Sequence, residues 1–131
     1  MEAGDVVKVI DGEQFPCDLL VLTTSEPLAD CKIQTANLDG ERNLKTRQAL
    51  TATVGMFERD KLLTKPGEVK LEANCPDYKL AYFKGNLSIA GEKYWVDSKQ
   101  LLLRGSNLRN TEYIVGMVVY PGPFTKIMMN Q

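Results

Sequence analysis

The chain contains no histidine among its 131 residues. Histidine is the commonest general base near neutral pH and a frequent metal ligand, so its absence removes the most familiar catalytic and zinc sites. The three cysteines, Cys17, Cys31 and Cys75, are odd in number and far apart in sequence. This argues against a disulfide framework and against a zinc site, and it favours buried thiols in a reducing compartment.

Long apolar runs and a strong net charge are also missing. The longest apolar run, YIVGMVV at 113–119, is far shorter than a membrane span and contains Gly116, so it suits a strand. The formal net charge is -1, which provides no electrostatic case for binding nucleic acid or an anionic membrane surface. No signal peptide opens the chain, and we expect Met1 to be an initiator placed on a fragment of a longer polypeptide.

What remains is the composition of one globular domain, which we expect to span residues 1–131. The chain is 44% hydrophobic and 25% charged, with short β-branched and aromatic runs separated by turn residues. Strands are predicted at 6–10, 18–22, 31–35, 69–71, 78–82, 86–90, 93–96, 100–104 and 113–120. Short helices are predicted at 56–63 and 124–131. The pattern predicts an all-β fold of the sandwich or jelly-roll type.

The stretch TANLDGERNLK, from Thr35 to Lys45, concentrates charge in what reads as a turn. One interpretation is a solvated tip around the turn dipeptide Asp39-Gly40. The other is that Gly40 lets the backbone approach a ligand closely and that Glu41 orients or deprotonates a water molecule. The chain has no nearby nucleophile and no phosphate-binding loop, so a catalytic Glu41 would need a substrate supplied by another domain.

Several distinctive motifs follow one another along the chain. They are DGEQFPCDLLVL, NLDGERNLK, GEVKLEANCPDYKLAYFKGNL, LLLRGSNLRNTEYIVGMVVY and TKIMMN. Together they resemble the actuator domain of type IV P-type ATPases, the phospholipid flippases, over residues 4–130. The resemblance implies a distorted jelly roll with minor short helices, placed in the cytosol between the second and third membrane helices of an integral membrane protein.

The resemblance also implies a function for the parent protein, which would hydrolyse ATP with Mg²⁺ through a phosphorylated aspartate and translocate a phospholipid. The partners would be the phosphorylation and nucleotide-binding domains of the same chain, phospholipid at the parent's membrane helices and an accessory membrane subunit, with no nucleic acid. The fragment alone would hold no cofactor or metal and would be inactive. Glu41 matches the family's catalytic glutamate, and Asp39 and Gly40 match the residues before it, with Asp39 shaping the loop.

The other matched residues are interpreted as scaffold. Asp11-Gly12 is predicted to be a hairpin turn, Asp18 to hold a loop through backbone amides and Gly105 to adopt an unusual backbone angle. Arg104 and Arg109 are expected near the surface, solvated or locally paired, although either could meet another domain of the parent.

The chain departs from the family at three positions: Arg42 replaces the usual threonine, Cys17 an alanine, and Phe124 an acidic residue. Arginine is a strong phosphate partner, so Arg42 would slow dephosphorylation, obstruct docking or point into solvent. This keeps open an alternative, a catalytically degenerate flippase-like regulatory or scaffold module in a fused protein. A stand-alone β-rich binding domain is a third interpretation.

Overall fold

The computed structural model describes residues 2–36, 42–58, 69–74, 83–89, 91–119 and 125–128. In chain order, the first elements are β1 (Val6–Ile10), β2 (Leu19–Thr24), β3 (Asp30–Ala36), β4 (Arg42–Gln48) and α1 (Thr51–Glu58). They are followed by β5 (Val69–Asn74), β6 (Lys84–Ile89), β7 (Glu92–Asp97), the 3₁₀ helix η4 (Ser98–Gln100), β8 (Leu101–Leu102), β9 (Asn107–Arg109), β10 (Tyr113–Val118) and β11 (Thr125–Met128).

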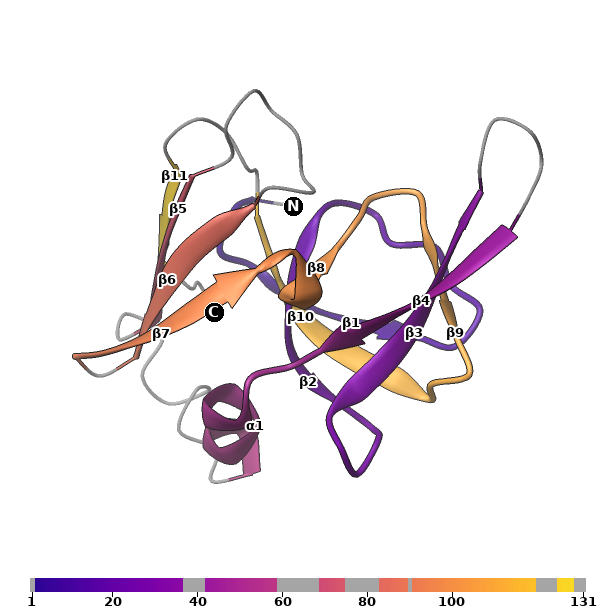
Figure 1. The fold of residues 1–131 in the computed structure, drawn as a ribbon, viewed down its shortest axis with the longest axis horizontal. Coiled ribbons are helices and arrows are strands. Elements are labelled where there is room, and N and C mark those ends of the chain that lie inside the picture. Colours follow the sequence, from indigo (N-terminus) through magenta and orange to yellow (C-terminus); the bar gives the residue numbers. More distant parts are fainter. Residues whose placement is uncertain are drawn as a thin grey trace.

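The strands form three antiparallel sheets, which confirms the prediction of an all-β fold with minor helices. The middle sheet has the order β1-β10-β2-β8, the outer sheet β11-β5-β6-β7 and the hairpin sheet β4-β3-β9. Figure 1 shows the outer sheet on the left and the hairpin sheet on the right, with β8 and β10 between them.

Strand β2 of the middle sheet is buried on both faces, and the alternation of its side chains shows why. Leu20 and Leu22 pack into one cluster together with the inward side chains of the outer sheet. Leu19 and Val21 point the opposite way, into a second cluster shared with the hairpin sheet. A strand buried on both faces needs a continuous apolar run, and the sequence supplies one at 19–22.

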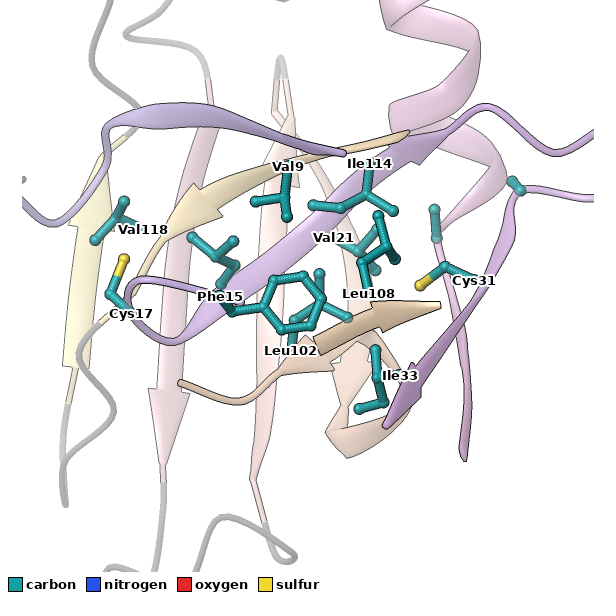
Figure 2. Close-up of a cluster of buried hydrophobic side chains, with 13 residues drawn as sticks. Val9, Phe15, Cys17, Val21, Cys31, Ile33, Leu102, Leu108, Ile114 and Val118 are labelled. Carbon is teal, nitrogen blue, oxygen red and sulfur yellow. The ribbon is translucent and has the colours of Figure 1, made fainter. Parts of the chain in front are cut away.

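The second cluster includes two of the three cysteines and is drawn in Figure 2. Phe15 and Ile33 are almost wholly buried in it, with Cys17 and Cys31 in the same cluster. The prediction of buried thiols is therefore confirmed for Cys17 and Cys31, while Cys75 lies outside the described residues.

The predicted helices differ from those observed. Helix α1 covers Thr51–Glu58, so it begins five residues before the helix predicted at 56–63. Residues 59–63 of the predicted helix lie outside the described range. The helix predicted at 124–131 is wrong where the structure describes it, because Thr125–Met128 forms β11. This strand pairs antiparallel with β5, from Thr125 opposite Ala73 to Met128 opposite Lys70, so a long-range pairing overrides the local helical composition.

Most of the predicted strands are confirmed, although that at 100–104 is reduced to Leu101–Leu102 and that at 78–82 lies outside the described residues. The hairpin at Gly91-Glu92 is also confirmed, since β6 and β7 pair from Ile89 opposite Glu92 onward.

The prediction for Asp11-Gly12 is wrong in one respect. The backbone does turn there, with Gly12 at φ 87° and the Glu13 amide donating to the Ile10 carbonyl at 3.0 Å. The turn does not make a hairpin, however, because β1 pairs with β10 and not with the strand that follows it.

The loop that precedes β9 is tied to the start of β2. The Arg104 amide donates to Oδ1 of Asp18 at 2.9 Å, which confirms the predicted role of that carboxylate. Gly105 has φ 87°, as its predicted role requires. Among the described residues, no helix is long and apolar enough to cross a membrane.

Candidate functional site

The β3–β4 hairpin carries the segment with the predicted catalytic residues. β3 and β4 pair continuously from Asp30 opposite Gln48 to Ala36 opposite Arg42. On its other side β3 pairs with β9 only as far as Gln34. The end of the hairpin therefore extends beyond the third strand of its sheet, as the β3 and β4 ribbons show in Figure 1.

Asp39, Gly40 and Glu41 lie outside the described residues, in the segment 37–41 that joins the paired ends of β3 and β4. Their assignment as a catalytic group therefore stays a prediction. The structure does describe the backbone on both sides, since Ala36 and Arg42 are paired strand residues. Arg42, the departure from the family pattern, thus stands at the first position of β4.

The base of the hairpin is anchored to the rest of the domain by side chains of two elements. Arg47 in β4 donates from Nε to the Leu101 carbonyl of the middle sheet at 3.0 Å. Partial burial lowers the pKa of the Arg47 guanidinium from its ordinary value. Gln100 in η4 donates from Nε2 to the Gln48 carbonyl at 3.1 Å. These bonds hold one end of the hairpin while the other projects.

The outer face of the hairpin sheet is polar. Lys32 donates from Nζ to Oγ1 of Thr46 at 2.6 Å, and Arg109 donates from Nε to Oε1 of Gln34 at 2.7 Å. The prediction of a locally paired arginine is thus confirmed for Arg109. These cross-strand bonds involve residues of all three strands and brace the sheet behind the projecting end.

Near the projecting end, β4 is exposed to solvent. Leu44, opposite Gln34, is 52% exposed, and Lys45 and Thr46 are also exposed. β4 is an edge strand, because its sheet has the order β4-β3-β9. This side of the hairpin is therefore accessible to another protein surface.

One polar group near this end was not anticipated from the sequence. Oγ1 of Thr35, in β3, is buried and has no hydrogen-bond partner. Threonine is an ordinary strand-forming residue, so nothing in the sequence distinguishes Thr35 from a structural residue.

Two of the pockets lined by described residues lie away from the projecting end of the hairpin. One, of about 480 Å³, is lined by Thr23, Thr24, Ser25, Glu26, Pro27, Val54, Tyr113 and Val115. The other, of about 120 Å³, is lined by Glu26, Asp30, Cys31, Lys32, Asn110 and Thr111. Among the residues that the structure describes, no group of three or more acidic or cysteine side chains could hold a metal ion.

Buried thiols do not provide a nucleophile in the described regions. Burial raises the pKa of the Cys31 thiol to about 12, and the negative charge of Asp30 adds to this effect. Burial also raises the pKa of the Cys17 thiol, with Asp18 adding to it. Both groups therefore stay protonated and unreactive near neutral pH.

No family model matches the chain. The chain is 43% identical over 130 residues, 99% of its length, to "Probable phospholipid-transporting ATPase 12" of Arabidopsis thaliana. The chain is thus similar to one segment of phospholipid-transporting ATPases. Two further relatives are "Phospholipid-transporting ATPase FetA" of Mus musculus, 41% identical over 131 residues (99% of this chain), and "Phospholipid-transporting ATPase ID" of Homo sapiens, 42% identical over 127 residues (97% of this chain).

These similarities confirm the resemblance to phospholipid-transporting ATPases over nearly the whole chain. The chain spans 11% of the length of the Arabidopsis and mouse proteins and 10% of the human one. It therefore corresponds to one segment of these ATPases.

Proposed function

We propose that this chain is the actuator domain of a phospholipid-transporting P-type ATPase and that it lies in the cytosol. Its β3–β4 hairpin carries Asp39-Gly40-Glu41 to an aspartyl phosphate in another domain of the same protein. The observation that supports this most strongly is the hairpin itself, paired as far as Ala36 and Arg42 and extending past β9. The similarity to phospholipid-transporting ATPases over 99% of the chain also supports it.

Glu41 is the residue assigned to the chemistry. Its carboxylate orients a water molecule and accepts a proton as the water attacks the phosphorus. Gly40 has no side chain and permits close approach of the backbone to the phosphoryl group. Asp39 shapes the loop by bonding to its own backbone. The parent supplies the aspartyl phosphate, formed from ATP with Mg²⁺ in its phosphorylation and nucleotide-binding domains.

Separation of Glu41 from the phosphorylated residue has a mechanistic purpose. The aspartyl phosphate is a covalent intermediate that must persist until the membrane region has changed conformation. When the water-activating carboxylate belongs to a domain that docks, hydrolysis waits for docking, and dephosphorylation is coupled to phospholipid translocation.

The proposal predicts the effect of Glu41→Gln in the full-length ATPase. The variant should form phosphoenzyme from labelled ATP but lose the label about 10²–10⁴-fold more slowly, because the amide cannot accept a proton from water. Glu72→Gln, an exposed carboxylate on the outer sheet, is the matched control and should leave the decay unchanged. Decay of the Glu41→Gln phosphoenzyme at the parent rate would exclude the proposed role.

A second candidate function follows from Arg42, which adjoins Glu41 at the start of β4. A cation beside the phosphoryl group would retain phosphate and slow turnover, and the parent would then act as a slow or regulatory member of the family. Arg42→Thr in the full-length protein should accelerate loss of the phosphoenzyme if this is so. An unchanged rate would favour the fully active ATPase. Absence of an Asp-Lys-Thr-Gly phosphorylation motif from the parent would favour a scaffold.

A further inference from the structure

Strand β7 forms one edge of the outer sheet, and it carries the single tryptophan of the chain. In the order β11-β5-β6-β7, β7 pairs with β6 on one side and, among the described residues, with no strand on the other (Figure 1). Trp95 is 74% exposed, although tryptophan is a residue that usually buries most of its surface. An open strand edge is a template for pairing with another strand, and here an exposed aromatic side chain stands beside it.

The open edge of β7 presents backbone groups at alternate residues. A two-residue loop joins β6 to β7, and such loops follow a hydrogen-bonded pair, which places the backbone of Glu92 in the ladder. Because these pairs alternate along an antiparallel ladder, the N–H and C=O groups of Lys93 and Trp95 face away from β6. The Asp97 amide follows the same alternation, since it donates to Oε1 of Gln100 at 2.9 Å and not to β6.

The outward side chains of β7 are complementary to themselves. Lys93, Trp95 and Asp97 alternate with Tyr94 and Val96, which pack on the core side. If a second β7 runs antiparallel with Trp95 opposite Trp95, each Lys93 lies opposite Asp97 of the second copy. Opposite charges placed directly across a ladder attract. Sliding the strands by two residues, the smallest shift that keeps the backbone groups matched, removes both charge pairs.

We propose that β7 is a self-association surface whose occupant is the β7 strand of a second copy of this chain. The two four-stranded outer sheets join into one continuous sheet across a two-fold axis. The two Trp95 side chains meet at that axis, and two ion pairs between Lys93 and Asp97 flank them. A contact of one strand pair is small, so the dimer is weak and forms at high concentration. This inference does not depend on the role of Glu41.

The test exchanges charges in the 131-residue chain and measures sedimentation equilibrium from micromolar to millimolar concentration. Lys93→Asp places like charges opposite Asp97, and Asp97→Lys places like charges opposite Lys93, so each variant alone should dimerise about tenfold more weakly. An equal mixture of the two variants should regain nearly the parent affinity, because every facing pair is again of opposite charge. Lys70→Asp, at an exposed position of β5 in the same sheet, is the matched control and should dimerise as the parent does.

Trp95 provides a second readout, because no other tryptophan contributes to the emission of the chain. Its fluorescence should shift to shorter wavelength as the dimer forms, and Trp95→Ser should weaken the dimer about tenfold. Asp97 also accepts from the Lys99 amide in η4, so circular dichroism must show that Asp97→Lys is folded. Lys93→Asp and Trp95→Ser test the contact without that variant.

Three results would overturn the inference. One is a chain that stays monomeric up to millimolar concentration. Another is a dimer that neither Lys93→Asp nor Trp95→Ser weakens, which would place the contact on a different surface. The third is a pair of folded charge variants that gain no affinity on mixing, which would exclude this register. Each of these results leaves the proposed function standing, because decay of the phosphoenzyme tests that function separately.

Discussion

Gly85 lies in β6 where the backbone of β5 passes too close for any side chain. A Cβ built at this position would stand 2.5 Å from the Glu72 carbonyl oxygen and 3.1 Å from Cα of Ala73. Both contacts are with backbone atoms, which cannot rotate away. Close packing of the two strands thus accounts for the glycine two residues after Phe83 in the stretch FKGNL.

We therefore predict that Gly85→Ala lowers the free energy of unfolding by about 1–3 kcal/mol through overpacking. Lys84→Ala, at the exposed neighbouring position of the same strand, should change it by less than about 0.5 kcal/mol. Urea unfolding of the chain measures both. Equal stability of the two variants would mean that β5 and β6 can separate without cost.

Ionisation of the buried Cys31 thiol should make the free energy of unfolding depend on pH. Its ordinary pKa is 9.0 and burial raises it to about 12, so between these values the unfolded thiol ionises while the folded thiol keeps its proton. In this range the folded state binds more protons than the unfolded state. The contribution of Cys31 to stability is fully present below about pH 9 and falls as the pH rises, by up to about 1.4 kcal/mol per pH unit.

Replacement of Cys31 with alanine should remove this contribution. The cavity lowers stability at every pH, but the decline between pH 9 and pH 11 should be shallower than in the parent chain. Urea unfolding at pH 8, 9.5 and 10.5 gives the two slopes. Parallel slopes would show that Cys31 ionises equally in both states.

At the scale of an element, the hairpin depends on bonds at its base. Arg47→Met keeps an apolar stem of similar length but removes the donor to the Leu101 carbonyl. We expect faster amide hydrogen exchange in β4 and unchanged exchange in β6 and β7, whose inward side chains belong to the other core cluster. Uniformly faster exchange in all sheets would instead indicate global destabilisation.

The elements also show how far the sequence predicts the fold. The sequence predicts strands at 6–10, 18–22 and 113–120 because most of their residues are β-branched or apolar without a helical period. The strand at 125–128 was missed because its cause is distant: four residues of helical composition complete the edge beside β5. Helix α1 begins earlier than predicted because Oγ1 of Thr53 donates a hydrogen bond to the Leu22 carbonyl of β2. This is a tertiary contact, which local helix propensity does not include.

The features of the candidate site also differ in how far the sequence predicts them. Motif resemblance predicted Asp39, Gly40 and Glu41, and nothing in the described structure tests their positions. The anchoring role of Asp18 was predicted because acids near strand ends bond readily to backbone amides. The unpaired Thr35 hydroxyl could not be predicted, since a missing partner is a property of the packed neighbourhood and not of the residue.

At the scale of the whole molecule, the middle sheet contributes to both hydrophobic clusters and separates the outer sheet from the hairpin sheet. Adjacent residues of β2, Leu20 and Val21, belong to opposite clusters, so neither face can slide without disturbing the other. The domain is consequently stiff between its two outer layers. A torque applied at the hairpin would therefore rotate the domain as one rigid body, and bending would be confined to the segments that connect the domain to its neighbours.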